Sequence, residues 1–165
     1  MFVRIPALLL VAAALVAAVA GCGSPDQNGD AVPGIIPAPA SFELQEDAAP
    51  FRLAERSRIV VRGDGAEAVA EAFAATIRPG TGYALPVVRG EAGASDLSFE
   101  IGIDTAPDHA AEGYTLESGV DGVRLRAATA EGLFRGTQSL RQLLPPEIER
   151  ADATSPPAAG WIVPA

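Results

Sequence analysis

Two stretches of the chain carry the hydrophobic period of an α-helix, and short stretches typical of β-strands lie before and between them. Apolar residues recur at helical spacing over residues 66–77 and 133–144. Alternating or β-branched apolar residues occupy residues 42–45, 51–53, 58–62, 85–88, 97–103, 114–117 and 123–127. Because runs of strands separate the helices, this order predicts an α+β fold in which a single mixed or antiparallel sheet carries both helices on one face.

Polar and proline residues predict where the two helices begin and end. Asp64 followed by Glu67 resembles a capping box, and Pro79-Gly80 predicts the end of the first helix. Thr129 is a suitable N-cap for the second helix, which Pro145-Pro146 is expected to stop.

The N-terminus has the layout of an export signal. A short positive start, ending at Arg4, precedes an apolar stretch over residues 5–20. This stretch is shorter than the roughly 20 apolar residues that span a bilayer. Val19-Ala20-Gly21-Cys22 resembles the bacterial lipoprotein signal, in which the cysteine is lipidated and becomes the first residue of the mature protein. The alternative is an ordinary secretory signal with an incidental cysteine.

The lipoprotein interpretation divides the N-terminal part of the chain into two segments. Residues 1–21 are the expected lipoprotein signal peptide, with lipidation at Cys22, and residues 22–33 have little to bury and are expected to form a flexible tether. We therefore expect the protein to be exported and anchored by lipid to the extracytoplasmic face of a bacterial cell membrane.

Charge and residue usage exclude several classes of function. The chain has 12 arginines, no lysine and 21 acidic residues, a formal net charge of −9. This balance argues against nucleic acid as a partner, because phosphate binding needs clustered basic residues. His109 and Cys22 are the sole histidine and cysteine. We therefore expect no metal site, no cofactor and no His-assisted nucleophile.

Four carboxylates lie at the ends of expected strands, where the acid and base pair of a glycosidase could stand. Glu100 and Asp104 flank the end of one expected strand, and Glu112 and Glu117 bracket another. Such a pair works in a cleft that usually carries aromatic side chains, and aromatics make up 5% of this chain. We expect these carboxylates to be surface groups and assign no catalytic residue.

Five segments carry a more specific resemblance. They are residues 35–39 (Ile-Ile-Pro-Ala-Pro), 51–53 (Phe-Arg-Leu), 112–116 (Glu-Gly-Tyr-Thr-Leu), 122–145 and 161–164 (Trp-Ile-Val-Pro). Together they resemble the N-terminal, non-catalytic domain of glycoside hydrolase family 20, the β-N-acetylhexosaminidases.

The resemblance implies a zincin-like α+β domain at residues 34–150, followed by a connection at residues 151–165 to a catalytic (β/α)8 barrel. In this family the barrel carries an Asp-Glu pair and uses the 2-acetamido oxygen of the substrate as nucleophile. Neither the pair nor the barrel, of about 250 residues, is expected in this chain. It should therefore not hydrolyse a glycoside alone.

Two hypotheses for the whole protein follow. The first is an N-terminal fragment of a lipoprotein β-N-acetylhexosaminidase. The second is a stand-alone, lipid-anchored module that docks a separately encoded partner. In either case, the last helix carries more large apolar residues than one sheet face needs, so part of this set should be exposed. The set is Leu133, Phe134, Leu140, Leu143 and Leu144.

Overall fold

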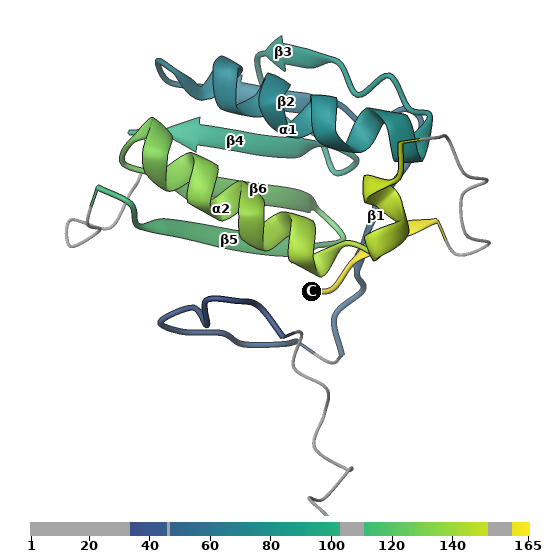
Figure 1. Cartoon of the computed structure of the whole chain (residues 1–165), viewed down its shortest axis with the longest axis horizontal. Coiled ribbons are helices and arrows are strands. Elements are labelled where there is room, and N and C mark those ends of the chain that lie inside the picture. Colours follow the sequence, from purple (N-terminus) through teal and green to yellow (C-terminus); the bar gives the residue numbers. More distant parts are fainter. Residues whose placement is uncertain (1–33, 46, 103–110, 152–159) are drawn as a thin grey trace, which may run out of the picture. The chain divides into compact units, whose positions relative to one another are not determined.

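The computed structural model describes residues 34–45, 47–102, 111–151 and 160–165 (Figure 1). Its main sheet has five strands in the order β3-β2-β4-β6-β5. The strands are β2 (Ile59–Arg62), β3 (Val87–Arg89), β4 (Leu97–Ile101), β5 (Tyr114–Gly119) and β6 (Gly122–Ala127). The first four in spatial order run parallel, and β5 pairs antiparallel with β6. The main sheet is therefore mixed, one of the two arrangements predicted.

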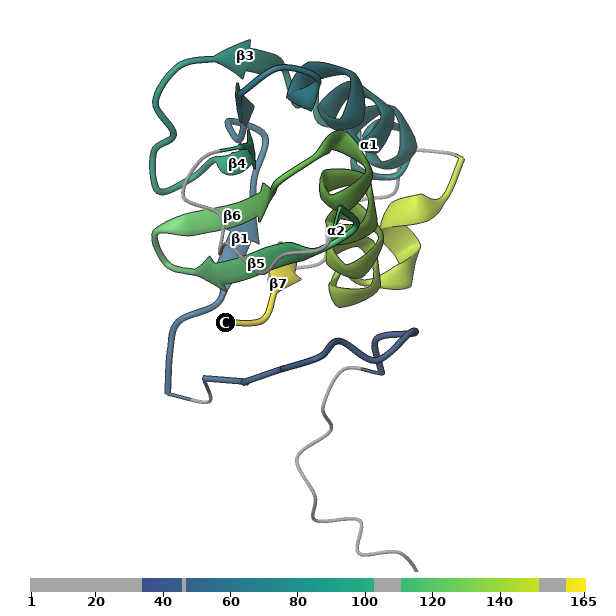
Figure 2. The same ribbon diagram turned by 90° about the vertical axis from the view of Figure 1, so that its left-hand side faces the viewer.

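Both helices cover the same face of this sheet. Helix α1 (Ala66–Thr81) follows β2, and α2 (Ala130–Leu143) follows β6, before the short 3-10 helix η1 (Pro146–Glu149). Figure 2 shows α1 and α2 side by side on one side of the sheet. The α+β class with two helices on one face is confirmed.

The predicted start of α1 differs from the observed one. The N-cap is Gly65, in the left-handed region at φ 86°, and no side chain caps the helix. The expected capping box of Asp64 and Glu67 therefore does not form. The Glu67 carboxylate lies instead 3.3 Å from the Arg89 guanidinium of β3.

The predicted end of α1 is also wrong. The helix continues through Pro79 to Thr81 and ends at Gly82, at φ 68°, whose N–H donates to the carbonyl of Arg78. The Thr81 hydroxyl donates to the carbonyl of Ile77 at 2.9 Å. Tertiary packing keeps the last turn helical, because Thr81 is only 3% exposed.

The predicted limits of α2 are confirmed. The Thr129 hydroxyl accepts a hydrogen bond from the N–H of Gly132 at 3.2 Å, as an N-cap should. The helix ends at Leu143, just before the two prolines.

Two expected strands are corrected. Residues 42–45 do not form a strand, because only the Gln45 N–H reaches a distant backbone acceptor, the carbonyl of Ala165 at 3.0 Å. The strand expected at 85–88 is β3, at Val87–Arg89, because Leu85 has a positive φ of 39° that a strand cannot continue.

The first and last strands form a separate ribbon rather than joining the main sheet. Strand β1 (Phe51–Leu53) pairs antiparallel with β7 (Trp161–Val163). Strand β7 lies within the segment expected to be a connection. These residues are built into the fold, because the Trp161 and Val163 side chains are at most 1% exposed.

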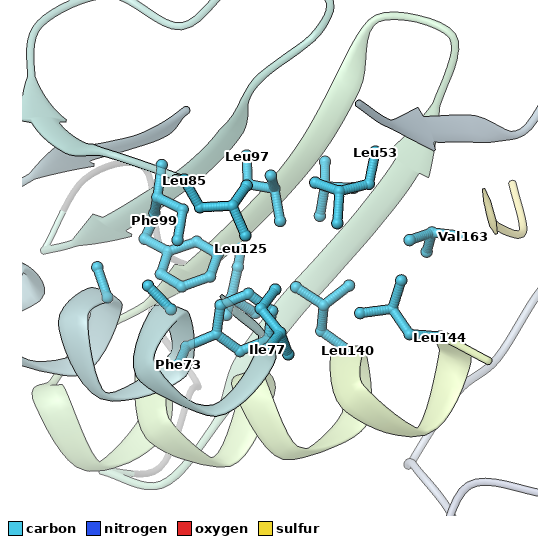
Figure 3. Packing of buried hydrophobic residues seen from close by; sticks show 14 of the residues in the cluster. Leu53, Phe73, Ile77, Leu85, Leu97, Phe99, Leu125, Leu140, Leu144 and Val163 are labelled. Atoms are coloured by element: carbon cyan, nitrogen blue, oxygen red, sulfur yellow. The ribbon is translucent and has the colours of Figure 1, made fainter. Parts of the chain in front are cut away.

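The hydrophobic core lies between the helices and the sheet and continues to the ribbon (Figure 3). Phe73 of α1 meets Phe99 of β4 edge to face, with ring centroids 5.4 Å apart. Helix α2 approaches β6 closely, since a Cβ on Gly136 would lie 2.3 Å from a methyl group of Leu125. Within the described ranges, no helix has the length and hydropathy needed to cross a bilayer.

Candidate functional site

Three of the residues singled out in the sequence lie outside the described residues. They are Cys22, Asp104 and His109. Lipidation of Cys22 therefore stays a prediction.

Two of the candidate carboxylates, Glu100 and Glu117, lie on the sheet face away from the helices. Glu100 is 7% exposed and accepts a hydrogen bond from the Ser98 hydroxyl at 2.7 Å. Its other oxygen lies 3.8 Å from Nε of Arg126. Glu117 lies 3.5 Å from Arg126 and 3.7 Å from Arg124. The structure thus brings these two carboxylates together around an arginine.

The third described carboxylate, Glu112, lies elsewhere. It forms an ion pair with Arg135 of α2 at 3.2 Å. All three glutamates are therefore held by arginines, an arrangement of structural ion pairs and not of an acid and base facing a substrate cleft. The expectation that these carboxylates are surface groups is wrong for Glu100, which is buried beside Ser98 and Arg126. In the part of the chain that the structure describes, no group of three or more His, Cys, Asp or Glu residues could hold a metal ion.

Asp96 is an interacting carboxylate that the sequence did not single out. It accepts hydrogen bonds from the Arg58 N–H at 3.1 Å, the Arg58 guanidinium at 2.5 Å and the Gly93 N–H at 3.0 Å. Burial raises the pKa of Asp96, but the hydrogen bonds from Arg58 and Gly93 outweigh burial and leave the pKa below its ordinary value. Asp96 joins the start of β2 to the start of β4, which neither strand pattern could have revealed.

A hollow of about 400 Å³ lies next to Asp96 and the turn between β5 and β6. Two of the carboxylates that line it are held by arginines, Asp96 by Arg58 and Glu117 by Arg124. The third, Asp121, has no ion pair among the described residues.

The helix layer carries the other candidate site. Leu133 and Leu140 of α2 are fully buried, and Leu144, just after the helix, is 4% exposed, whereas Phe134 of α2 is 48% exposed. Leu143 is partly buried. The expectation of exposed apolar surface on this helix is met chiefly by Phe134.

Phe134 borders a hollow of about 380 Å³, the α2 hollow, which is also lined by Glu112, Ala130, Glu131 and Arg135. A hydrogen bond and a close backbone contact fix the segments that line this hollow. The Thr129 hydroxyl donates to the carbonyl of Ala111. A Cβ on Gly132 would lie only 2.4 Å from the carbonyl oxygen of Gly113. The first turn of α2, which carries Phe134, is thus closely packed against residues 111–113.

Comparisons with known proteins agree with this fold. The sequence pattern of the family described as Glycosyl hydrolase family 20, domain 2, matches residues 32–164. A β-hexosaminidase of Porphyromonas gingivalis is 32% identical over 118 residues, which cover 72% of this chain and 15% of that protein.

Solved structures show the same relation. The GH20 β-N-acetylhexosaminidase of Streptomyces coelicolor A3(2) is 38% identical, with a TM-score of 0.69, over 79% of this chain and 24% of that one. The N-acetyl-β-hexosaminidase of Streptomyces plicatus is 37% identical, with the same TM-score and the same coverage. The chain thus spans about a quarter or less of the length of these relatives. It belongs to glycosyl hydrolase family 20, as a copy of that family's domain 2.

Proposed function

We propose that this chain acts as the supporting, non-catalytic domain of a β-N-acetylhexosaminidase, which removes terminal N-acetylhexosamine residues in carbohydrate metabolism. The family match over residues 32–164 supports the role, as does the similarity to two Streptomyces enzymes. The catalytic chemistry then belongs to a (β/α)8 barrel, and this domain contributes a surface against which the barrel packs.

The exposure of Phe134 supports the proposal that this surface lies on α2. Large apolar side chains elsewhere on the helix, such as Leu133 and Leu140, are fully buried, but Phe134 leaves 48% of its surface in solvent. Aromatic side chains are enriched at the centres of protein interfaces, where they fill or border pockets. The α2 hollow beside Phe134 gives a partner side chain such a pocket.

The charges around the α2 hollow indicate which charge a complementary partner surface would carry. Glu112 is paired with Arg135, whereas no ion pair of Glu131 occurs among the described residues. The surface therefore carries one uncompensated negative charge next to an aromatic ring. A barrel surface with an apolar side chain beside an arginine or lysine is complementary to it.

Co-expression tests this role. The full chain is produced together with the S. coelicolor enzyme from which the corresponding domain has been removed, and that enzyme's own domain serves as the positive control. We expect the two parts to co-purify. Truncating a hot-spot residue of an interface costs about 2 kcal/mol or more, so Phe134→Asp should weaken the association at least about tenfold if Phe134 is such a residue.

Val120→Asp is the matched control, because Val120 is also exposed, at 65%, but lies in the turn between β5 and β6. It should leave association unchanged. The proposal is wrong if the positive control associates and this chain does not. The placement on α2 is wrong if Phe134→Asp and Val120→Asp behave alike.

We further propose that the protein is exported and anchored to the membrane by lipid on Cys22. The apolar segment that ends in Val19-Ala20-Gly21-Cys22 supports this assignment. Metabolic labelling with an alkyne analogue of palmitate should label the chain and place it in the membrane fraction, and Cys22→Ser should abolish both. A secreted, unlabelled chain would instead identify an ordinary export signal.

A further inference from the structure

Two hydrogen bonds hold residue 36 against the last turn of α2. The Ile36 N–H donates to Oε1 of Gln142 at 2.8 Å, and Nε2 of Gln142 donates to the Ile36 carbonyl at 3.0 Å. The side-chain amide of Gln142 thus satisfies both backbone groups of Ile36, as a neighbouring strand would. We call these two hydrogen bonds the Gln142 clip.

The clip leaves a large apolar side chain in solvent. Ile35 is 8% exposed and ties the segment to the domain, whereas Ile36 is 79% exposed. The side chain of Ile35 is therefore turned toward the domain and that of Ile36 toward water. The clip fixes the backbone of Ile36 without burying its side chain, so this contact adds no hydrophobic stabilisation to the isolated domain.

Ile36 and Phe134 are both held on the outward side of α2. The exposed residues of this helix define that side, and they are Glu131, Phe134, Arg135 and Gln142. Gln142 follows Phe134 by eight residues, a separation of about 12 Å along the helix axis. Among the described residues, the exposed large apolar side chains are those of Ile36, Val120 and Phe134. Two of these three are thus attached to one helix face.

The charges on this face favour a protein as its partner. Both arginines of α2 are engaged in ion pairs, Arg135 with Glu112 at 3.2 Å and Arg141 with Glu149 at 2.6 Å. Nucleic acid or an anionic lipid surface needs free positive charge, and the formal net charge of this chain is −9. A partner surface that is apolar and carries little negative charge is complementary to this face.

We propose that Ile36, presented by the Gln142 clip, is a second apolar contact with the catalytic (β/α)8 barrel, on the same surface as Phe134. The inference rests on the proposed function. The chain covers 24% of each Streptomyces enzyme, so most of each relative lies outside this domain. A standard interface buries about 800 Å² per partner, a patch about 30 Å across, and attachment points about 12 Å apart fit within one such patch.

The clip contributes to binding by ordering the segment before the barrel arrives. A free segment would have to be ordered on association, at a cost in conformational entropy that weakens binding. With the clip closed, this cost is met during folding. The barrel then contacts an Ile36 side chain that is already in place.

Truncation of Ile36 tests the contact. Ile36→Ala removes the side chain but keeps both backbone groups of the clip. It should weaken the association of the full chain with the domain-deleted S. coelicolor enzyme at least about fivefold, the loss that marks an energetically important interface residue. Val120→Ala is the matched control, because Val120 is also an exposed apolar residue, at 65%, but lies in the turn between β5 and β6. It should leave the dissociation constant unchanged.

Gln142→Ala tests the role of the clip. It should accelerate hydrogen exchange at the Ile36 amide and weaken association by about two- to tenfold, the usual cost of ordering a freed group. If the clip acts by presenting Ile36, this substitution should add nothing in the Ile36→Ala background, because no side chain is left to present. The dissociation constants of Ile36→Ala and of the double variant should therefore be equal.

Failure of the proposed function is recognised separately. If the S. coelicolor domain binds its own barrel and the unaltered chain does not, both proposals are wrong. If the unaltered chain binds and Ile36→Ala binds equally well, only the contact at Ile36 is wrong. Additive effects of Ile36→Ala and Gln142→Ala, or an Ile36 amide that stays protected in Gln142→Ala, would refute the role of the clip. Loss of self-association in Ile36→Ala without loss of barrel binding would identify a second copy as the occupant and overturn the proposal.

Discussion

Replacing Trp161 by alanine tests whether the ribbon of β1 and β7 is part of the hydrophobic core. Trp161 is fully buried, and Leu53, its partner across the ribbon, is 2% exposed, as is Phe51, the partner of Val163. Removing a buried aromatic side chain leaves a cavity and typically costs 3–5 kcal/mol, against a total stability of about 5–15 kcal/mol for a domain. We therefore expect Trp161→Ala to lose about a fifth or more of the free energy of unfolding.

Urea denaturation followed by circular dichroism measures this loss, because Trp161 is the sole tryptophan and its fluorescence disappears with it. Ile162→Ala is the matched control, since Ile162 lies in the same strand but is only partly buried. It should cost less than about 1.5 kcal/mol, as substitutions outside the core usually do. Equal midpoints for Trp161→Ala and Ile162→Ala would show that β7 is merely a connecting segment.

The indole nitrogen of Trp161 refines the same prediction. It is the one buried side-chain polar atom, among the described residues, without a hydrogen-bond partner. A buried unsatisfied donor costs about 1–3 kcal/mol. Phenylalanine at this position keeps much of the ring and removes the donor, so Trp161→Phe should cost clearly less than Trp161→Ala. A loss as large as that of alanine would show that the N–H is satisfied.

Three further outcomes are expected. Gly132→Ala should destabilise the fold by about 1–3 kcal/mol in urea, since the methyl group meets the Gly113 carbonyl and this overpacking exceeds the roughly 1 kcal/mol gained in helix propensity; a stabilised variant would refute the close approach. The pKa of Asp96 is lower in the folded state than the unfolded value of about 3.9, so its interaction with Arg58 stabilises the fold above that pH and is lost as the pH falls through the folded-state pKa. Asp96→Asn should therefore reduce the fall in stability between about pH 5 and pH 2, and an unchanged pH dependence would contradict this assignment. The purified chain should release no nitrophenol from a nitrophenyl N-acetylglucosaminide, and measurable turnover would show that an acid and base pair had been missed.

The elements that the sequence predicted best are those in which local chemistry and tertiary packing agree. Thr129 begins α2 because its hydroxyl bonds the first turn, and the prolines at 145–146 end it, both through neighbours in the chain. The end of α1 was missed for the opposite reason. Pro79 breaks helices by local rules, but burial of Thr81 and the hydrogen bond from its hydroxyl keep the turn intact.

The candidate site likewise has features that the local sequence predicts and features that only tertiary packing decides. The excess of apolar residues on α2 could be counted in the sequence, but their periodicity does not tell which one is exposed. Phe134 points away from the core because Leu133 and Leu140 occupy the side of the helix that packs on the sheet. The hydrogen bonds of Gln142 with Ile36 and of Asp96 with Arg58 join residues 106 and 38 positions apart, and no local sequence pattern reveals such pairs.

By itself, the sequence determined the α+β class, the boundaries of α2, the placement of both helices on one face of a sheet and the family to which the chain belongs. These properties depend on hydrophobic period, capping and motif, which act over a few residues. Only the tertiary structure decided that β7 closes the core against β1, that α1 runs through its proline and that Phe134 remains in solvent. Those outcomes depend on which surfaces meet after the chain has folded back on itself, because burial between distant segments outweighs local preference there.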